Sequence, residues 1–115
     1  MKLLIVGSRE INEFNIENYI SDEVDTILSG GAKGVDLIAE RYADKNRISK
    51  IILRPKYDLY GKAAPLKRNE ELVEMADKVL AVWDGASKGT QYTINYAKKL
   101  NKDIQIVIIK KIPQP

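Results

Sequence analysis

The stretch "TILSGGAKGVDLIAERY", residues 26–42, changes its hydrophobic pattern twice. It opens with a short aliphatic run at Thr26–Leu28, which is typical of a buried parallel strand. A glycine-rich turn follows, and beyond it apolar side chains recur at Val35, Ile38, Ala39 and Tyr42, the spacing of one helix face. The stretch therefore predicts a strand that enters a helix through a turn of glycines, the residue that costs most to order.

The rest of the chain repeats this alternation. Further aliphatic runs predict strands at Lys2–Val6, Lys50–Leu53, Lys78–Trp83 and Ile104–Ile109. Between the strands lie segments with helical spacing: Ile16, Tyr19 and Ile20; Leu72, Val73 and Ala76; Ile94, Ala97 and Leu100. Such a βαβαβαβαβ order forces parallel strands with right-handed crossovers. We expect one α/β domain over residues 1–115, a Rossmann-like, doubly wound, five-stranded parallel sheet with helices on both faces in a three-layer sandwich.

Composition excludes several classes of protein. The 115 residues include no cysteine, so a disulfide framework, a thiolate metal site and a cysteine nucleophile are ruled out. Histidine is also absent, and proton transfer would fall to Asp, Glu, Lys or Tyr. The apolar run in "MKLLIVGSRE" is too short for a membrane span or a signal sequence. We expect a cytoplasmic protein without metal or cofactor and without membrane contact.

The special residues concentrate in the loops that follow the strands. All glycines of the chain fall there: Gly7, Gly30, Gly31, Gly34, Gly61, Gly85 and Gly89. The turns that follow the helices contain none, although helix ends ordinarily favour glycine. Basic residues share these loops: Arg9, Lys33, Arg54, Lys56, Lys62, Lys67, Arg68 and Lys88. Glycine turns that open into helix N-termini beneath a positive rim predict an anion site, and phosphate is the anion that we expect.

Neither standard nucleotide fingerprint is present. The sequence lacks G-x-x-x-x-G-K-[ST], and the first turn has Gly7 alone where a dinucleotide fold needs G-x-G-x-x-G. A P-loop NTPase and an ordinary NAD dehydrogenase are therefore disfavoured. The phosphate cradle is expected in "SGGAKG" (29–34), in "GASKGT" (85–90), or in both.

Four motifs in register resemble the SLOG superfamily over almost the whole chain. They are "GSRE" (7–10), "SGGAKGVD" (29–36), "YGKAAPLKRN" (60–69) and "ADKVLAVWDGASKGTQYTI" (76–94). The sequence is most similar to the small, single-domain YspA-like and YpsA-like members, which are related to the DNA-processing protein DprA (Smf) and to the LOG phosphoribohydrolases. The resemblance implies a Rossmann-like domain that binds nucleotides or nucleotide-derived ligands, sometimes as a sensor. Dimerisation is implied by the resemblance alone.

The same resemblance implies a set of ligand-binding positions. The first wall would be Gly7, Ser8 and Arg9, and the second Ser29, Gly30, Gly31, Ala32, Gly34 and Asp36. The third-helix contact would be Arg68 and Asn69, and the phosphate turn Gly85, Ser87, Lys88, Gly89 and Thr90. The residues themselves add Asp84, which directly follows the fourth strand, and Lys62 and Tyr60 of the long Arg54–Pro65 connection, where Tyr60 has little core to fill.

Two alternatives to a binding module stay open. In the LOG enzymes a glutamate follows the G-T turn, whereas Gly89 and Thr90 are followed here by Gln91. Because N-glycosidic cleavage ordinarily uses a carboxylate, a nucleoside-phosphate N-glycosidase is the second choice, with Arg68 and Asp84 as candidate catalytic residues and Asp36 as a loop-ordering one. Single-stranded DNA binding is the third, and the small size of the chain argues against it.

Overall fold

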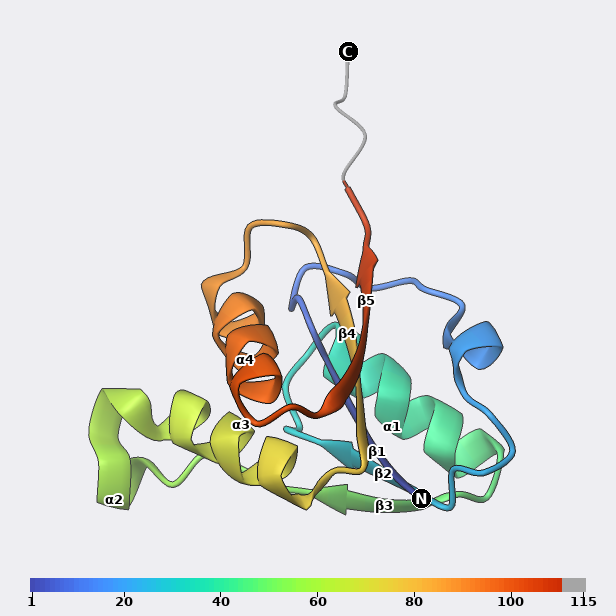
Figure 1. Cartoon of the computed structure of the whole chain (residues 1–115), viewed down its shortest axis with the longest axis horizontal. Coiled ribbons are helices and arrows are strands. Elements are labelled where there is room, and N and C mark those ends of the chain that lie inside the picture. The colour runs from blue at the N-terminus through green and yellow to red at the C-terminus, as the bar shows by residue number, and fades with distance from the viewer. Residues whose placement is uncertain (111–115) are drawn as a thin grey trace.

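Five strands form a single parallel sheet in the order β3-β2-β1-β4-β5 (Figure 1). The structure is a computed structural model and describes residues 1–110. The strands are β1 (Lys2–Gly7), β2 (Thr26–Ser29), β3 (Ser49–Ile52), β4 (Lys78–Trp83) and β5 (Asp103–Ile108). The α/β class with a five-stranded parallel sheet is therefore confirmed, and each strand bound lies within one residue of the prediction.

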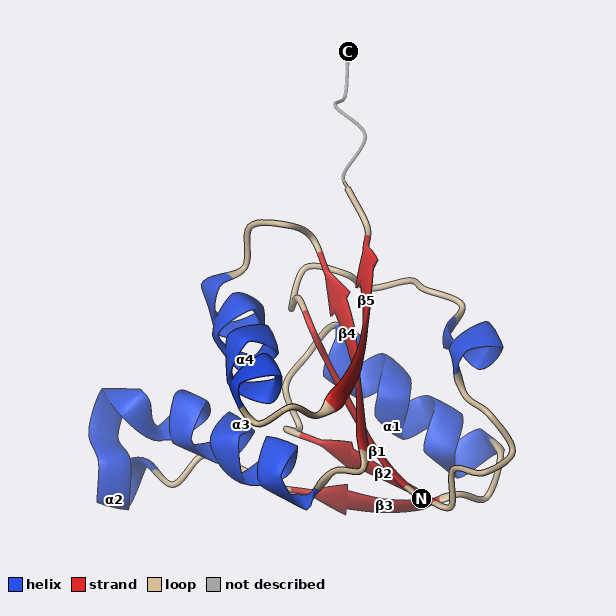
Figure 2. Ribbon diagram, viewed as in Figure 1, coloured by secondary structure: helices blue, strands red, loops and turns tan. Residues whose placement is uncertain are grey.

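Helices cover both faces of the sheet (Figure 2). Helix α1 (Val35–Lys45) packs on one face together with the 3-10 helix η1 (Ile16–Tyr19). Helices α3 (Ala64–Met75) and α4 (Lys88–Lys99) pack on the other. Successive side chains of β1 serve the two cores in turn, because a strand alternates its faces: Leu3 and Ile5 face α1, and Leu4 and Val6 face α3 and α4.

The order of the strands creates a switch point between β1 and β4. From β1 the chain steps outward to β2 and β3, then crosses back to pair β4 with the opposite side of β1. Leu4 consequently pairs with Leu28 on one side and with Val79 on the other. Both neighbours of β1 are parallel to it, so the carboxyl ends of these strands meet at one edge.

The first predicted helix is wrong in type and length. The segment around Ile16, Tyr19 and Ile20 forms only the single 3-10 turn η1. Asn15 precedes it and accepts the backbone N–H of Glu17 with its side chain, at 3.3 Å, while Ile20 is already extended. The Asn15 bond is an N-cap that favours the start of the turn at Ile16, and the turn ends where the backbone becomes extended at Ile20.

The long connection before α3 is more ordered than expected. It contains the short helix α2 (Tyr57–Tyr60) and the 3-10 turn η2 (Gly61–Ala63), which runs directly into α3. No residue of α2 is buried. In Figure 1 this segment projects from the body of the domain beside the start of α3.

Candidate functional site

A cavity of about 500 Å³ opens beside the ends of β1 and β4. The chain leaves these neighbouring strands toward opposite faces of the sheet, since β1 leads to η1 and β4 leads to α4. Loops that diverge in this way leave a crevice between them, and open α/β sheets bind ligands in it. The volume lies within the range of small-molecule sites.

The cavity collects residues from all four predicted loops. The predicted site residues that line it are Gly7, Arg9, Ala32, Asp36, Arg68, Asn69, Asp84, Ser87, Gly89 and Thr90. The others lie outside its lining: Ser8, Ser29, Gly30, Gly31, Gly34, Tyr60, Lys62, Gly85 and Lys88. Several of these outer residues hold the loops in place.

Ser8 joins three segments directly behind the lining. Its side chain is buried, and its hydroxyl oxygen accepts the backbone N–H of Asp84 at 3.0 Å. Its own N–H donates to the carbonyl of Val82, and its carbonyl accepts the N–H of Val35, the first residue of α1. One serine thereby fixes the loop after β1, the loop after β4 and the start of α1.

The glycines of "SGGAKG" are required by contacts within the protein. A Cβ at Gly30 would lie 2.7 Å from the guanidinium carbon of Arg68, and one at Gly31 would lie 2.5 Å from Arg54 Nη1. Gly34 has a φ of +74°, and its Cβ would lie 2.5 Å from the Ser8 carbonyl oxygen. The sequence alone suggested that an anion occupies the space beside this turn, but the structure places two of the protein's own arginines against it.

Arg68 is the centre of these contacts, and it is only 7% exposed. Its Nη1 donates to the carbonyl oxygens of Gly30 and Leu53, and its Nε donates to Asn69 Oδ1 at 2.7 Å. Its Nη2 has no hydrogen-bond partner within residues 1–110. Burial lowers the pKa of Arg68, and the nearby Asp36 opposes this effect. The guanidinium is therefore held rigidly at the cavity wall and stays charged.

Asn69 extends this network to the start of α4. Its side-chain nitrogen donates to Thr93 Oγ1 at 2.8 Å, and the Thr93 hydroxyl donates to the Gly89 carbonyl at 3.0 Å. The side-chain amide of Asn69 thus uses its oxygen toward Arg68 and its nitrogen toward α4. Helix α3 and the start of α4, which both contribute to the cavity lining, are therefore fixed relative to each other.

The N-terminus of α4 faces the cavity with free N–H groups. The side-chain oxygen Oδ1 of Asp84 accepts the N–H groups of Ala86 and Ser87, each at 2.8 Å, and shapes the turn before the helix. The N–H groups of the next three residues, 88–90, donate to no acceptor within the described chain. The first turn also contains no acidic residue and no side-chain cap. The start of α4 therefore presents free N–H groups and a positive helix end to the cavity, next to the Asp84 carboxylate.

Comparison with known proteins identifies relatives of this chain. Over 111 residues, covering 85% of this chain and 89% of the relative, it is 32% identical to the gene 61 protein of Mycobacterium phage D29. The chain belongs to the family of the phage gene 61 protein. A shorter match is to the uncharacterized SPbeta prophage-derived protein YoqJ of Bacillus subtilis (strain 168). The two sequences are 40% identical over 40 residues, which cover 35% of this chain and 23% of YoqJ. No protein-family model and no solved structure matches the chain.

In this member of the gene 61 protein family, Asp36 is a buried carboxylate on the cavity wall. It is 7% exposed, and its Oδ2 accepts the Ala32 N–H at 3.1 Å. Burial raises the pKa of Asp36, while this hydrogen bond and the charge of Arg68 act in the opposite direction. Its carboxylate forms no hydrogen bond with the Arg9 or Lys62 side chain. A carboxyl with a raised pKa in a cleft is a candidate proton donor or acceptor.

Asp84 differs from Asp36 in its electrostatics. The N–H groups of Ala86 and Ser87 stabilise its ionised form and lower its pKa. A carboxylate that is held ionised at a turn is a poor general acid, and its observed contacts are those of a turn-forming residue. Its position on the cavity wall agrees with the candidate site, but its chemistry favours a structural role.

Part of the lining lies outside the predicted binding positions. These residues are Val6, Glu10, Pro65 and Leu66; Ala86, also in the lining, belongs to the predicted "GASKGT" cradle. Glu10 matters most because it adds a third carboxylate to the lining, besides those of Asp36 and Asp84. Glu10 directly follows Arg9 in "GSRE", and this position in a predicted binding loop could have identified it as a lining residue. Pro65 and Leu66 supply an apolar wall, and only the position of α3 shows that they face the cavity.

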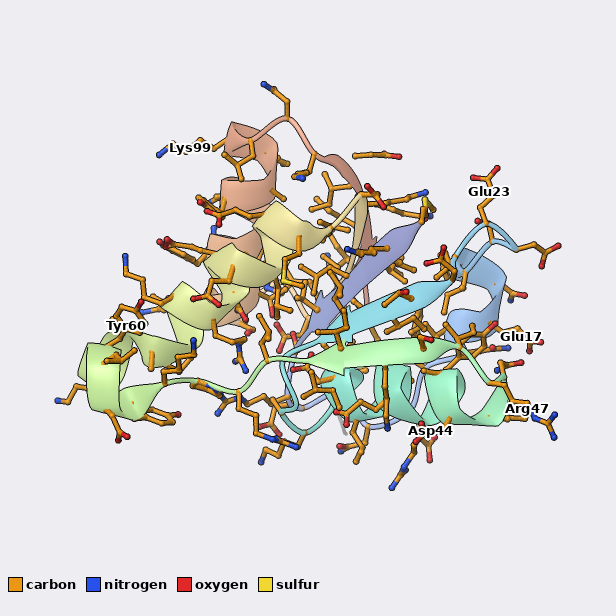
Figure 3. All side chains as sticks on the ribbon, turned by 90° about the horizontal axis from the view of Figure 1, so that it is seen from below. Glu17, Glu23, Asp44, Arg47, Tyr60 and Lys99 are labelled. Carbon is orange, nitrogen blue, oxygen red and sulfur yellow. The ribbon has the colours of Figure 1, made fainter. Side chains whose placement is uncertain are left out.

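Tyr60 and Lys62 lie on the projecting segment α2–η2 and do not line the cavity. Figure 3 labels Tyr60 at the outer end of this segment. Tyr60 lines a separate small pocket with Arg54 and Glu71. Both residues were expected in the site, and neither contributes to the cavity in this structure.

Two further findings concern the described residues 1–110. They contain no group of three or more acidic side chains arranged to hold a metal ion. Among their helices, none combines the length and the apolar character that crossing a bilayer requires.

Proposed function

We propose that the cavity binds a nucleotide or a nucleotide-derived phosphate ligand and that the protein acts as a sensor or ligand-binding module. The motifs that resemble the SLOG superfamily support this proposal, since they supply the loops that surround the cavity. The absence of a glutamate after Gly89 and Thr90 favours binding over cleavage.

The observation that carries the proposal is the start of α4. Gly89 has nothing within 4 Å of the position that a Cβ would take, and its φ is not in the left-handed region. Neither packing nor backbone conformation therefore requires glycine there, although glycine in a helix costs about 1 kcal/mol relative to alanine. A glycine without a Cβ at this position would allow a phosphate to approach the free N–H groups of residues 88–90 closely.

The opposite walls add charge and an apolar surface. Arg9 and the rigid Arg68 lie on the cavity wall, and Nη2 of Arg68 is available to a ligand. Pro65 and Leu66 provide the apolar surface that a base or sugar requires. We infer that the phosphate of the ligand binds at the start of α4 and that its base lies against Pro65 and Leu66.

The test is a thermal-shift screen of nucleoside mono-, di- and triphosphates on the wild type and on Gly89→Glu. Glutamate fits the open space, suits a helix N-terminus and should preserve or raise stability. Its charge should abolish phosphate binding. Gly89→Gln is the matched control, because it adds nearly the same bulk without the charge.

The expected wild-type shift corresponds to about 2.7 kcal/mol at a hundredfold excess over the dissociation constant. Stronger loss of binding in Gly89→Glu than in Gly89→Gln would support an anion at α4. The proposal fails if no nucleotide shifts the melting of the wild type, or if Gly89→Glu binds as the wild type does.

Asp36 favours a second candidate function, nucleoside-phosphate N-glycosidase activity. It is a buried carboxyl with a raised pKa on the cavity wall, close to Arg68, and could deliver or accept a proton there. Asp36→Asn retains an acceptor for the Ala32 N–H. Release of free base from a nucleoside monophosphate by the wild type, lost in Asp36→Asn while nucleotide binding persists, would establish this activity. Absence of released base from the wild type would exclude it.

A further inference from the structure

A second cavity of about 270 Å³ lies on the other side of the Gly30–Lys33 turn. Its walls include Lys33 and Tyr57, which do not line the first cavity. Arg9, Ala32 and Arg68 line both cavities. The two cavities therefore share a wall, and that wall carries two guanidinium groups.

The second cavity has a positively charged lining. Arg9, Lys33 and Arg68 contribute cations to its lining, and no acidic side chain contributes to it. None of the three forms a salt bridge within residues 1–110. Burial lowers the pKa of Arg68 most, the charge of Asp36 opposes this effect, and the charges of Arg9 and the nearby Arg54 lower the pKa further. The three cations of this lining repel one another, the Asp36 charge offsets part of this repulsion at Arg68, and a bound anion would offset more of it.

Two side chains make this cavity suitable for more than a free ion. Arg68 is held in place by its bonds to Gly30, Leu53 and Asn69, so its charge is preorganised. Tyr57 also lines this cavity and is 59% exposed. An exposed ring beside fixed cations is suited to stack on a base.

We propose that the ligand carries two separate phosphate groups, one at the start of α4 in the first cavity and one beside Arg9, Lys33 and Arg68 in the second. The ligand class is a nucleoside bisphosphate or a dinucleotide, and the Gly30–Lys33 turn lies between its two halves. This inference rests on the proposed function.

The test is isothermal titration with the 5′-monophosphates and the 3′,5′-bisphosphates of the four common nucleosides, and with a decanucleotide. The wild type should bind one bisphosphate at least about tenfold more tightly than its monophosphate, the effect of one added charge-assisted contact. Lys33→Ala should remove this advantage and leave monophosphate binding unchanged. Lys67→Ala is the matched control, since Lys67 is half exposed and lines neither cavity. Tyr57→Ala should also weaken binding of the bisphosphate selectively.

The outcomes separate this inference from the proposed function. Equal affinity for mono- and bisphosphate, or equal weakening of both by Lys33→Ala, would overturn the second subsite and leave the proposed function standing. Failure of every nucleotide to bind would overturn both. Much tighter binding of the decanucleotide than of the bisphosphate would assign the second cavity to a nucleic-acid strand and overturn the small-ligand proposal.

Discussion

The hydroxyl oxygen of Ser8 accepts the backbone N–H of Asp84 at 3.0 Å, although the two residues lie 76 positions apart. This bond joins the loops that follow β1 and β4, the two strands whose chains diverge to opposite faces of the sheet. The cavity opens between these loops. Its shape therefore depends on one buried side chain that does not line it.

Ser8→Ala should destabilise the protein by about 1–3 kcal/mol, because the Asp84 N–H loses its partner in a partly buried position. Urea denaturation measures this loss. Ser87→Ala is the control, since its hydroxyl forms only a 3.3 Å contact with Thr90 Oγ1 and caps no helix N–H. Equal stability of Ser8→Ala and wild type would show that the bond does not hold the two loops.

Alanine should have opposite effects at two glycines of the cavity. A Cβ at Gly7 would lie 2.5 Å from Val35 Cγ2 and would also meet the Val82 carbonyl, so Gly7→Ala should cost about 1–3 kcal/mol or more through overpacking. Gly89→Ala should gain up to about 1 kcal/mol, since the space is open and alanine favours the helix. Thermal or urea unfolding of both variants gives the comparison. A destabilised Gly89→Ala would indicate a packing role for this glycine.

Arg68→Ala should cost about 2–3 kcal/mol, because the carbonyl groups of Gly30 and Leu53 lose a charged donor in a buried place. Arg54→Ala is the comparison, since Arg54 is exposed and donates only to the Gly31 carbonyl. Its loss should cost less than about 1 kcal/mol. If the two variants lost the same stability, Arg68 would not be the residue that holds the glycine turn.

Arg47→Gly should stabilise the protein. Arg47 follows α1 with a φ of 56°, where the Ile48 N–H bonds back to the Ala43 carbonyl at 2.8 Å. A side chain in this left-handed position costs about 1 kcal/mol that glycine avoids, so we expect a gain of about 0.5–1 kcal/mol. Asn101 has the same conformation after α4. Asn101→Gly should gain less, because asparagine tolerates left-handed backbone, and calorimetry would rank the two variants.

The Tyr96 hydroxyl donates to Glu74 Oε1 at 2.6 Å, and this bond raises the pKa of Tyr96 to about 12. The neutral phenol is thus favoured in the folded state. The stabilisation is fully present below the unfolded pKa of about 10 and is lost as pH rises from about 10 to about 12. Wild type should therefore be more stable than Tyr96→Phe at about pH 9, and the difference should shrink as pH rises to about 12. A pH-independent difference would contradict this assignment.

The glycines show where sequence reasoning was incomplete. Their presence in the loops after the strands correctly placed those loops at one edge, because parallel strands all end there. Their purpose differed from one to the next. Gly30 and Gly31 make room for Arg68 and Arg54, whereas Gly89 stands in open space. The two kinds of glycine are distinguished by contacts between loops that lie far apart in the sequence. The local sequence pattern around each glycine does not predict these contacts.

The sequence by itself determined the parallel sheet and the bounds of its strands, because aliphatic runs that alternate with helical spacing admit few other arrangements. It also identified the loops that line the cavity. Only the tertiary structure decided which side chains face it, since that depends on how α1, α3 and α4 are oriented on the sheet. The packing turned Arg68 inward, used Asp84 in a turn, brought Glu10 to the wall and left Tyr60 and Lys62 outside.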